Sequence, residues 1–197
     1  LYGEDALERF AKLRVAVFGI GGVGCMAAES LARSGVGHFV LVDFDTIRPS
    51  NMNRQLAALH STLDLPKAEA MRRRILDINP DAEVEAMIEF ADENTRGAIL
   101  DRVDVAVDAI DSLGPKVGLL EDIIRKGLPV ISVMGAGGRK DPSAIRLDDL
   151  SRSHGCPLAK RVRKFLRRRG IETGLPCVYS NEPVVPQLDH ESGSEQE

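Results

Sequence analysis

Short apolar runs alternate with amphipathic stretches along the first two thirds of the chain. The apolar runs are rich in β-branched residues and have the length of buried strands, and the stretches between them have helical spacing. The pattern predicts strands at residues 14–19, 39–43, 84–88, 103–108 and 129–133, with helices at 24–34, 67–79, 95–100 and 116–126. This alternation is typical of an α/β protein, so we expect a Rossmann-like, doubly wound, mostly parallel sheet.

A glycine-rich segment joins the first predicted strand to the first predicted helix. Gly19, Gly21, Gly22 and Gly24 let backbone N–H groups approach a phosphate closely at the positive end of the helix dipole. Asp43 ends the next strand, about 20 residues on, where its carboxylate can accept hydrogen bonds from ribose hydroxyls. These features predict a nucleotide site, but NAD and FAD enzymes share them.

A polar cluster after the second predicted strand favours a triphosphate over a dinucleotide. Residues 43–55 read DFDTIRPSNMNRQ and include Asp45, Asn51 and Arg54, which we take as nucleotide ligands. The Arg54 guanidinium can bind two phosphate oxygens, Lys67 in the next helix can add a positive charge, and Asn51 can orient them. The alternatives are a surface ion pair for Arg54 and a solvated helix position for Lys67.

Two carboxylates, Asp108 and Asp111, lie three residues apart at the end of the fourth predicted strand. We expect both at one crevice, because ligands of such sheets bind at the carboxyl ends of the strands. Asp111 can hold Mg²⁺ together with nucleotide phosphates, or it can cap the following helix. Arg54, Lys67 and Asp111 are thus the predicted catalytic residues, since all three lie at strand ends around one glycine turn.

These motifs resemble the activating-enzyme superfamily, which includes MoeB, ThiF, HesA and the ubiquitin-activating enzymes. The resemblance also includes PKAE at 66–69, INP at 78–80 and DAIDS at 108–112, and it covers residues 1 to about 140. It implies ATP and Mg²⁺ as cofactors, with Asp43 on the ribose, Asn51, Arg54 and Lys67 on the phosphates, and Asp111 on the metal. The implied reaction is attack of a substrate carboxylate on the α-phosphate, which gives an acyl-adenylate and pyrophosphate.

Three further segments resemble one branch of this superfamily, the tRNA threonylcarbamoyladenosine dehydratases. They are LYGEDALERF at 1–10, GAGGRKDPSAIRLDDL at 135–150 and VYSNEPVVPQ at 178–187. The resemblance implies that the carboxylate of a threonylcarbamoyl group on tRNA is adenylated, and that the neighbouring ureido nitrogen then closes a ring with loss of AMP. It also implies a homodimer. Sulfur-transfer proteins are candidate partners, and a monovalent cation is a further candidate cofactor.

The cysteines and the hydropathy limit the class of protein further. Cys25, Cys156 and Cys177 are too few and too far apart for a disulfide framework or a CxxC zinc site, so we expect a reducing, cytoplasmic location. MoeB and ThiF hold zinc with two CxxC pairs, which argues against a close MoeB or ThiF role. Cys156 and Cys177 are candidates for a thioester or persulfide relay, but ring closure on the same substrate needs none. No apolar run approaches the ~20 residues that cross a bilayer.

A basic run stands out in a chain whose net charge is −4. Seven of the ten residues at 160–169 are basic and none is acidic, and Val162, Phe165 and Leu166 have the spacing of an apolar helix edge. An unmixed run predicts contact with a phosphate backbone, with a solvated helix face and attachment to a membrane surface as alternatives. The candidate nucleic-acid ligands are Lys160, Arg161, Arg163, Lys164, Arg167, Arg168 and Arg169.

Together these features predict an ATP-binding adenylation domain at 1–140, a basic, partly flexible substrate-binding extension at 141–189 and a disordered tail at 190–197. The predicted function is ATP-dependent cyclisation of N6-threonylcarbamoyladenosine in tRNA. One alternative is a MoeB- or HesA-like adenylation of the C-terminal carboxylate of a small carrier protein, and another is a non-catalytic nucleotide-binding subunit. The basic run favours RNA, and the retention of Arg54, Lys67 and Asp111 argues against a non-catalytic role.

Overall fold

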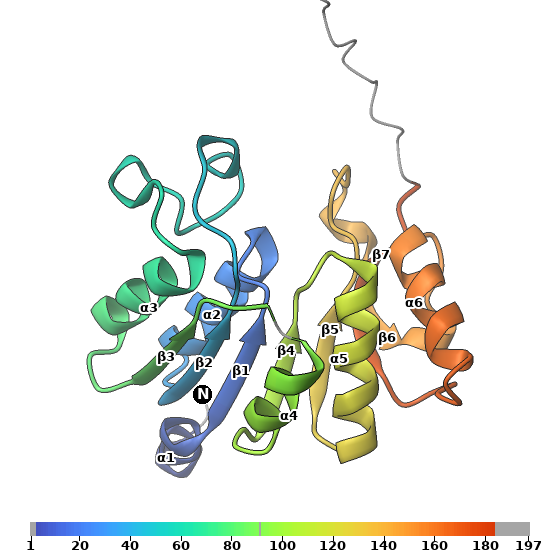
Figure 1. Ribbon diagram of the computed structural model, residues 1–197, viewed down its shortest axis with the longest axis horizontal. Coiled ribbons are helices and arrows are strands. Elements are labelled where there is room, and N and C mark those ends of the chain that lie inside the picture. Colours follow the sequence, from blue (N-terminus) through green and yellow to red (C-terminus); the bar gives the residue numbers. More distant parts are fainter. Residues whose placement is uncertain (1–2, 91, 184–197) are drawn as a thin grey trace, which may run out of the picture.

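Seven strands form one sheet in the computed structural model, which describes residues 3–90 and 92–183 (Figure 1). The strand order is β3-β2-β1-β4-β5-β7-β6, and all neighbouring strands are parallel except β6, which runs antiparallel to β7. The strands are β1 Arg14–Phe18, β2 His38–Val42, β3 Glu83–Met87, β4 Val105–Asp108, β5 Val130–Val133, β6 Ile145–Asp149 and β7 Pro176–Ser180. The helices are α1 Glu4–Lys12, α2 Gly22–Arg33, α3 Lys67–Ile78, α4 Glu93–Leu100, α5 Leu113–Lys126 and α6 Pro157–Arg167.

The predicted doubly wound fold is confirmed. Each of the five predicted strands and four predicted helices of the first 133 residues is present, with its ends displaced by at most three residues. The central strands are buried on both faces, which explains their uninterrupted apolar sequence. In β1, Val15 and Val17 pack toward one helix layer, and Ala16 and Phe18 pack toward the other.

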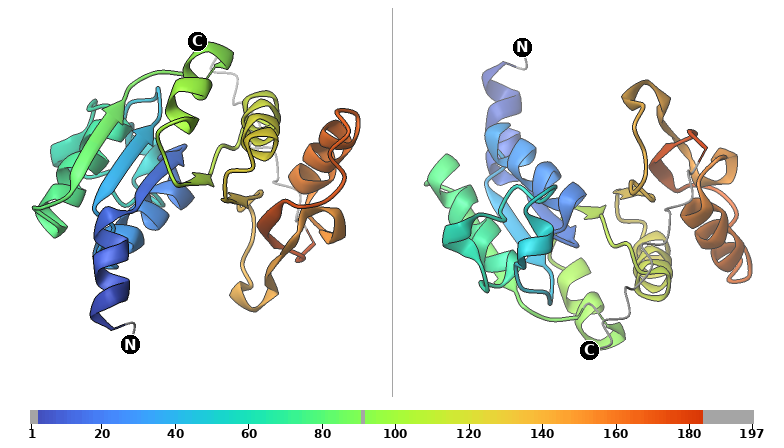
Figure 2. Two further views of the ribbon diagram at one scale, coloured as in Figure 1. Left: turned by 90° about the horizontal axis from the view of Figure 1, so that it is seen from below. Right: turned by 90° about the horizontal axis from the view of Figure 1, so that it is seen from above.

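The described helices pack on both faces of the sheet, but they cover one face only in part. Helices α2 and α3 pack on one face of β1, β2 and β3, and helices α4, α5 and α6 pack on the opposite face (Figure 2). Helix α6 lies beside α5, where Val162 and Leu166 enter the same apolar cluster as Leu120 and Ile123. The predicted apolar edge of the basic helix is therefore what attaches it to the sheet.

The sequence pattern did not predict α1, β6 or β7. Strand β7 pairs with β5, so part of the predicted C-terminal extension continues the sheet of the first 133 residues. Helix α6 begins at Pro157, three residues before the basic run. The functional division at residue 140 stays a prediction, and the predicted tail at 190–197 lies outside the described residues.

The packing of α6 predicts that it unfolds together with the sheet. Leu166 is 1% exposed, so Leu166→Ala leaves a cavity between α6 and α5, and we expect the free energy of unfolding to fall by about 2 to 5 kcal/mol. Urea unfolding followed by circular dichroism measures this change.

Arg167→Ala is the matched control, because Arg167 is the next residue along α6 and is exposed. It should change the stability by no more than about 0.5 kcal/mol. An unchanged main transition in Leu166→Ala would mean that α6 is not part of the cooperative core.

Candidate active site

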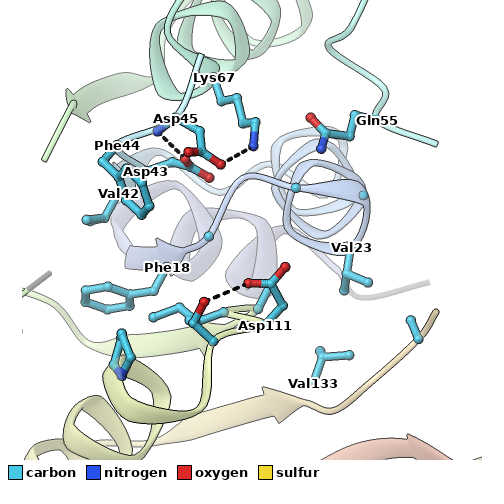
Figure 3. A pocket seen from close by; sticks show the side chains of 18 of the residues that line it. Phe18, Val23, Val42, Asp43, Phe44, Asp45, Gln55, Lys67, Asp111 and Val133 are labelled. Atoms are coloured by element: carbon cyan, nitrogen blue, oxygen red, sulfur yellow. Dashed lines mark hydrogen bonds and ion pairs between the residues drawn. The ribbon is translucent and has the colours of Figure 1, made fainter. Parts of the chain in front are cut away.

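A cavity of about 730 Å³ opens at the carboxyl edge of the sheet (Figure 3). It is lined by the segments that follow β1, β2, β3, β4 and β5, together with Lys67 of α3 and Leu158 of α6. The chain leaves β1 toward β2 and leaves β4 toward β5, so the connections diverge where these two neighbouring strands end. Such a divergence leaves a crevice that binds ligands in open α/β sheets.

The glycine turn brings the backbone close to this crevice. Gly19 has a φ of 85°, and a Cβ there would lie 2.8 Å from the carbonyl oxygen of Ala109. A Cβ at Gly24 would lie 1.7 Å from the carbonyl oxygen of Gly19, so only glycine allows α2 to begin directly behind the turn. Gly19, Gly21 and Gly22 line the cavity, whereas Gly24 is buried behind them and has a packing role. The first N–H groups of α2 thus face a space where an anion can bind.

A lysine and two aspartates lie on one side of the turn (Figure 3). The Lys67 ammonium is 2.6 Å from the Asp45 carboxylate, and the Asp43 carboxylate accepts hydrogen bonds from the backbone of Ile20 at 2.6 Å and Asp45 at 2.9 Å. Burial raises the pKa of Asp43, and those two backbone donors and the charge of Lys67 act against the rise. The cluster holds a positive charge and a fixed acceptor at the end of β2.

Arg54 and Asn51 also line the cavity, on the segment between β2 and α3. Arg54 is exposed, and its Nη1 donates to Ser50 O at 2.9 Å and to Asn53 Oδ1 at 2.8 Å. The Asn51 side chain accepts from the backbone of Arg48 at 3.0 Å, which fixes the short helix at Pro49–Asn51. The segment is therefore shaped by its own polar side chains, and it carries an exposed guanidinium into the cavity.

Asp111 approaches from the other side of the turn (Figure 3). Its carboxylate is exposed and accepts a hydrogen bond from Ser112 Oγ at 3.3 Å. The N-cap of α5 is Ser112, so the alternative role of Asp111 as helix cap is wrong. Among the described residues no group of three or more His, Cys, Asp or Glu could hold a metal ion. A single carboxylate suits Mg²⁺ that takes its other ligands from phosphates and water.

The expectation that Asp108 shares this crevice is wrong. Asp108 pairs in register with Phe18 and Ser132, so its side chain points to the α5 side of the sheet. There it is 0% exposed, with the Lys116 ammonium at 2.7 Å and Ser132 Oγ at 2.6 Å. Successive side chains along a strand point to opposite faces of the sheet. The number of residues between Asp108 and Asp111 therefore does not show whether both carboxylates face the same crevice.

Two aromatic residues and an amide of the cavity wall were not assigned from the sequence. Phe44 and Phe90 are exposed, lie at the ends of neighbouring strands and approach each other with ring centroids 5.4 Å apart. Exposed aromatic faces at a cavity can stack on a nucleobase. Gln55 is buried beside the glycine turn. The only sequence signal for the two rings was an apolar residue two or three positions after a strand, which is common.

The basic residues at 160–169, on α6 and just after it, do not all face outward. Arg163 donates to Leu150 O and Ser153 O, at 3.1 and 2.7 Å, and so holds the preceding loop. Arg169 pairs with Glu121, and the Arg168 guanidinium lies 5.4 Å from the centre of the Phe165 ring. In the described part of the chain, no ion pair or side-chain hydrogen bond involves the four remaining basic residues, which are all exposed: Lys160, Arg161, Lys164 and Arg167.

All three cysteines are buried. Burial raises the pKa of the Cys177 thiol to about 11, so at neutral pH it is the unreactive thiol form. Cys156 occupies the N-cap position of α6 without a side-chain cap hydrogen bond, and its thiol packs near Gly135. This environment favours a packing role for both residues over a covalent relay.

No described helix is long and apolar enough to span a membrane.

The ThiF family profile matches residues 1–175. The chain is 43% identical to the Bacillus subtilis tRNA threonylcarbamoyladenosine dehydratase over 95% of its length and 74% of that protein's length. The Escherichia coli molybdopterin-synthase adenylyltransferase is 31% identical over only 65% of the chain and 51% of its own length.

Solved structures give the same relationship. The E. coli tRNA N6-threonylcarbamoyladenosine dehydratase TcdA in complex with AMP matches with a TM-score of 0.92 and 39% identity, covering 96% of this chain and 80% of that one. Its complex with ATP matches with a TM-score of 0.89 and 38% identity, covering 93% and 79%. The resemblance seen in the motifs is confirmed. The chain therefore belongs to the ThiF family, and within that family to the tRNA threonylcarbamoyladenosine dehydratases.

Proposed function

We propose that the chain uses ATP to cyclise N6-threonylcarbamoyladenosine in tRNA. One observation carries the proposal: the glycine turn, Lys67, Arg54 and Asp111 line a single cavity at the carboxyl ends of β1 and β4. A cavity with an acidic ribose acceptor, two cations and an exposed carboxylate matches the chemical groups of ATP with Mg²⁺. The family relationship supports the same conclusion.

In this proposal the triphosphate lies at the start of α2, within reach of Lys67 and Arg54. Asp43 accepts from the ribose, Asp45 and Asn51 complete the polar wall, and the adenine lies toward Phe44 and Phe90. Mg²⁺, when bound by Asp111 and the phosphates, neutralises part of their charge. These side chains all line the cavity, where the charged ones complement the phosphates and the metal, Asn51 offers hydrogen bonds, and the two phenylalanines offer aromatic faces to the base.

The chemistry needs alignment more than proton transfer. The substrate carboxylate is an anion at neutral pH, and it attacks the α-phosphorus of ATP, so that pyrophosphate leaves and an acyl-adenylate forms. The ureido nitrogen of the same substrate then attacks the activated carbonyl. The new C–N bond closes the ring as the bond to AMP breaks, and the proton of that nitrogen passes to solvent. Lys67 and Arg54 hold and neutralise the phosphates, while the turn fixes their position.

The outer face of α6 supports tRNA as the substrate in preference to a carrier protein. Lys160, Arg161, Lys164 and Arg167 give an exposed row of positive charge on a helix whose start, at Leu158, lines the cavity. Apolar packing on α5 holds this row rigidly. A fixed cationic face beside the cavity suits the phosphate backbone of a large polyanion.

We further propose a homodimer that covers the open face of the sheet's C-terminal half. Figure 2 shows α2 and α3 on one face of β1 to β3, and among the described helices none over that face of β5, β7 and β6. Val133, Val178 and Leu147 are paired across these strands and so share that face, and Leu147 is 66% exposed. A second copy would bury this apolar row.

A monovalent cation, sulfur-transfer partners and a cytoplasmic location stay predictions.

Asp111→Asn tests the proposed chemistry. Incubated with ATP, Mg²⁺ and tRNA that carries threonylcarbamoyladenosine, the unaltered protein should form AMP and the cyclised base, and a carrier protein should not replace the tRNA. Loss of the metal-binding charge should lower the rate by about 100-fold or more. Asp81→Asn, at an exposed aspartate away from the cavity, is the matched control. An Asp111→Asn rate near that of the control would contradict the role of Asp111.

Neutral variants of α6 test the tRNA surface. Lys160→Gln combined with Lys164→Gln removes two cations, so the slope of log affinity for tRNA against log salt should become shallower by about 1 to 2 units. Filter binding at several salt concentrations measures the slope. Arg9→Gln with Lys12→Gln removes two exposed cations from α1 and should leave it unchanged. Equal slopes in the two double variants would exclude α6 as the contact.

Leu147→Glu tests the homodimer. A carboxylate on the exposed apolar face should separate the two copies, and light scattering coupled to size exclusion should report the mass of one 21.4 kDa chain in place of two. Ile88→Glu places the same charge on an exposed position at the end of β3, at the other side of the sheet, and should keep the dimer. A Leu147→Glu protein that stays dimeric would require another interface.

A further inference from the structure

Lys116 is the one lysine of the described chain whose side chain is sealed completely from solvent. It lies in the first turn of α5 and is 0% exposed, as is its partner Asp108. Burying two charges costs several kcal/mol per ion, and similar pairs can often be replaced by apolar residues without loss of stability. Stability alone is therefore a weak reason for this pair.

The contacts of Lys116 use all the hydrogens of its ammonium group. Nζ lies 2.7 Å from Asp108 Oδ2, and it donates to the carbonyl oxygens of Val133 at 2.7 Å and Ile110 at 3.0 Å. Asp108 is fixed in turn by Ser132 Oγ at 2.6 Å and by the backbone of Ile110 at 3.1 Å. Three donors meet three acceptors, so the geometry of the ammonium is fully determined.

The two carbonyl groups belong to the two segments that form one wall of the cavity. The paired register of β4 and β5 ends at Asp108 and Ser132. Ile110 lies beyond that point and directly precedes Asp111, and Val133 directly precedes the loop that lines the cavity at 134–137. Lys116 therefore joins the two segments where the sheet no longer does.

We propose that Lys116, together with Asp108 and Ser132, is a positioning residue that holds the Asp111 carboxylate where it meets the metal of bound ATP. Lys116 cannot touch the substrate, because its side chain is covered by the segments it joins. It acts on Asp111 through the carbonyl of Ile110. The inference rests on the proposed function, since it deepens the role of Asp111.

The test removes the clamp without leaving a buried charge. Lys116→Met with Asp108→Asn eliminates both charges, and the amide oxygen still accepts from Ser132. Calorimetry without tRNA measures the affinity for ATP with Mg²⁺ and with EDTA. We expect the Mg²⁺-dependent gain in affinity to fall by about tenfold or more, as it does when groups that orient metal ligands are removed. The affinity for ATP measured in EDTA should change less.

The control removes another ion pair on α5, in which Arg96 is buried and Asp122 is half-buried. Arg96 Nε lies 2.7 Å from Asp122 Oδ2 between α4 and α5, and neither residue lines the cavity. Arg96→Met with Asp122→Asn should lower the melting temperature but keep the Mg²⁺-dependent gain within about twofold. Equal loss in the two double variants would show a general effect of destabilisation and would overturn the proposal.

Ser132→Ala keeps the ion pair and removes one hydrogen bond to Asp108, so it provides a milder variant should the double variant not fold. We expect its Mg²⁺-dependent gain to fall by about threefold. If the folded variants keep the full Mg²⁺-dependent gain in ATP affinity, the positioning role is overturned while the proposed function stands. If the unaltered protein shows no Mg²⁺-dependent affinity for ATP, the metal role of Asp111 fails, and this inference fails with it.

Discussion

The parallel pairing of β1 with β4 is the constraint on which the site depends. Phe18 and Asp108 end side by side, and the backbone of Ala109 donates to Phe18 O at 2.8 Å, so the pairing continues one residue past the strands. Only a glycine at position 19 lets the chain turn beneath the carbonyl of Ala109. Because the connections then diverge, the glycine turn and the Asp111 segment face each other across a space that neither could form alone.

The sequence was sufficient wherever a local pattern determines the structure. Strands buried on both faces give continuous β-branched runs, and the glycine turn has a spacing that few other structures require. As a result, nine of the ten predicted nucleotide ligands line the cavity, the exception being Gly24. Their roles stay proposals, but their convergence follows from the topology.

The failures occurred where a residue's partner lies far along the chain. Asp108 looks like a site residue until Lys116 and Ser132 are known to cover it. Arg163 belongs to an unmixed basic run, yet it turns inward to the carbonyls of Leu150 and Ser153. Strand β6 was missed because its only apolar residues, Ile145 and Leu147, are too few to identify a half-buried strand, and both are exposed at the edge of the sheet. Strand β7 has only five residues and begins with a proline, so it resembles a loop in the sequence.

Two lysine–aspartate pairs flank the glycine turn, and their different burial gives them different uses. Both side chains of the Lys116–Asp108 pair are completely buried. The Lys116 ammonium therefore cannot exchange its acceptors for a ligand and can only fix the backbone. The Lys67–Asp45 pair lines the cavity, and the Asp45 side chain is 49% exposed. A phosphate can therefore compete with Asp45 for the Lys67 ammonium, since the carboxylate that it displaces regains water at little cost. The same two residue types thus give a fixed wall on one side of the cavity and an exchangeable cation on the other.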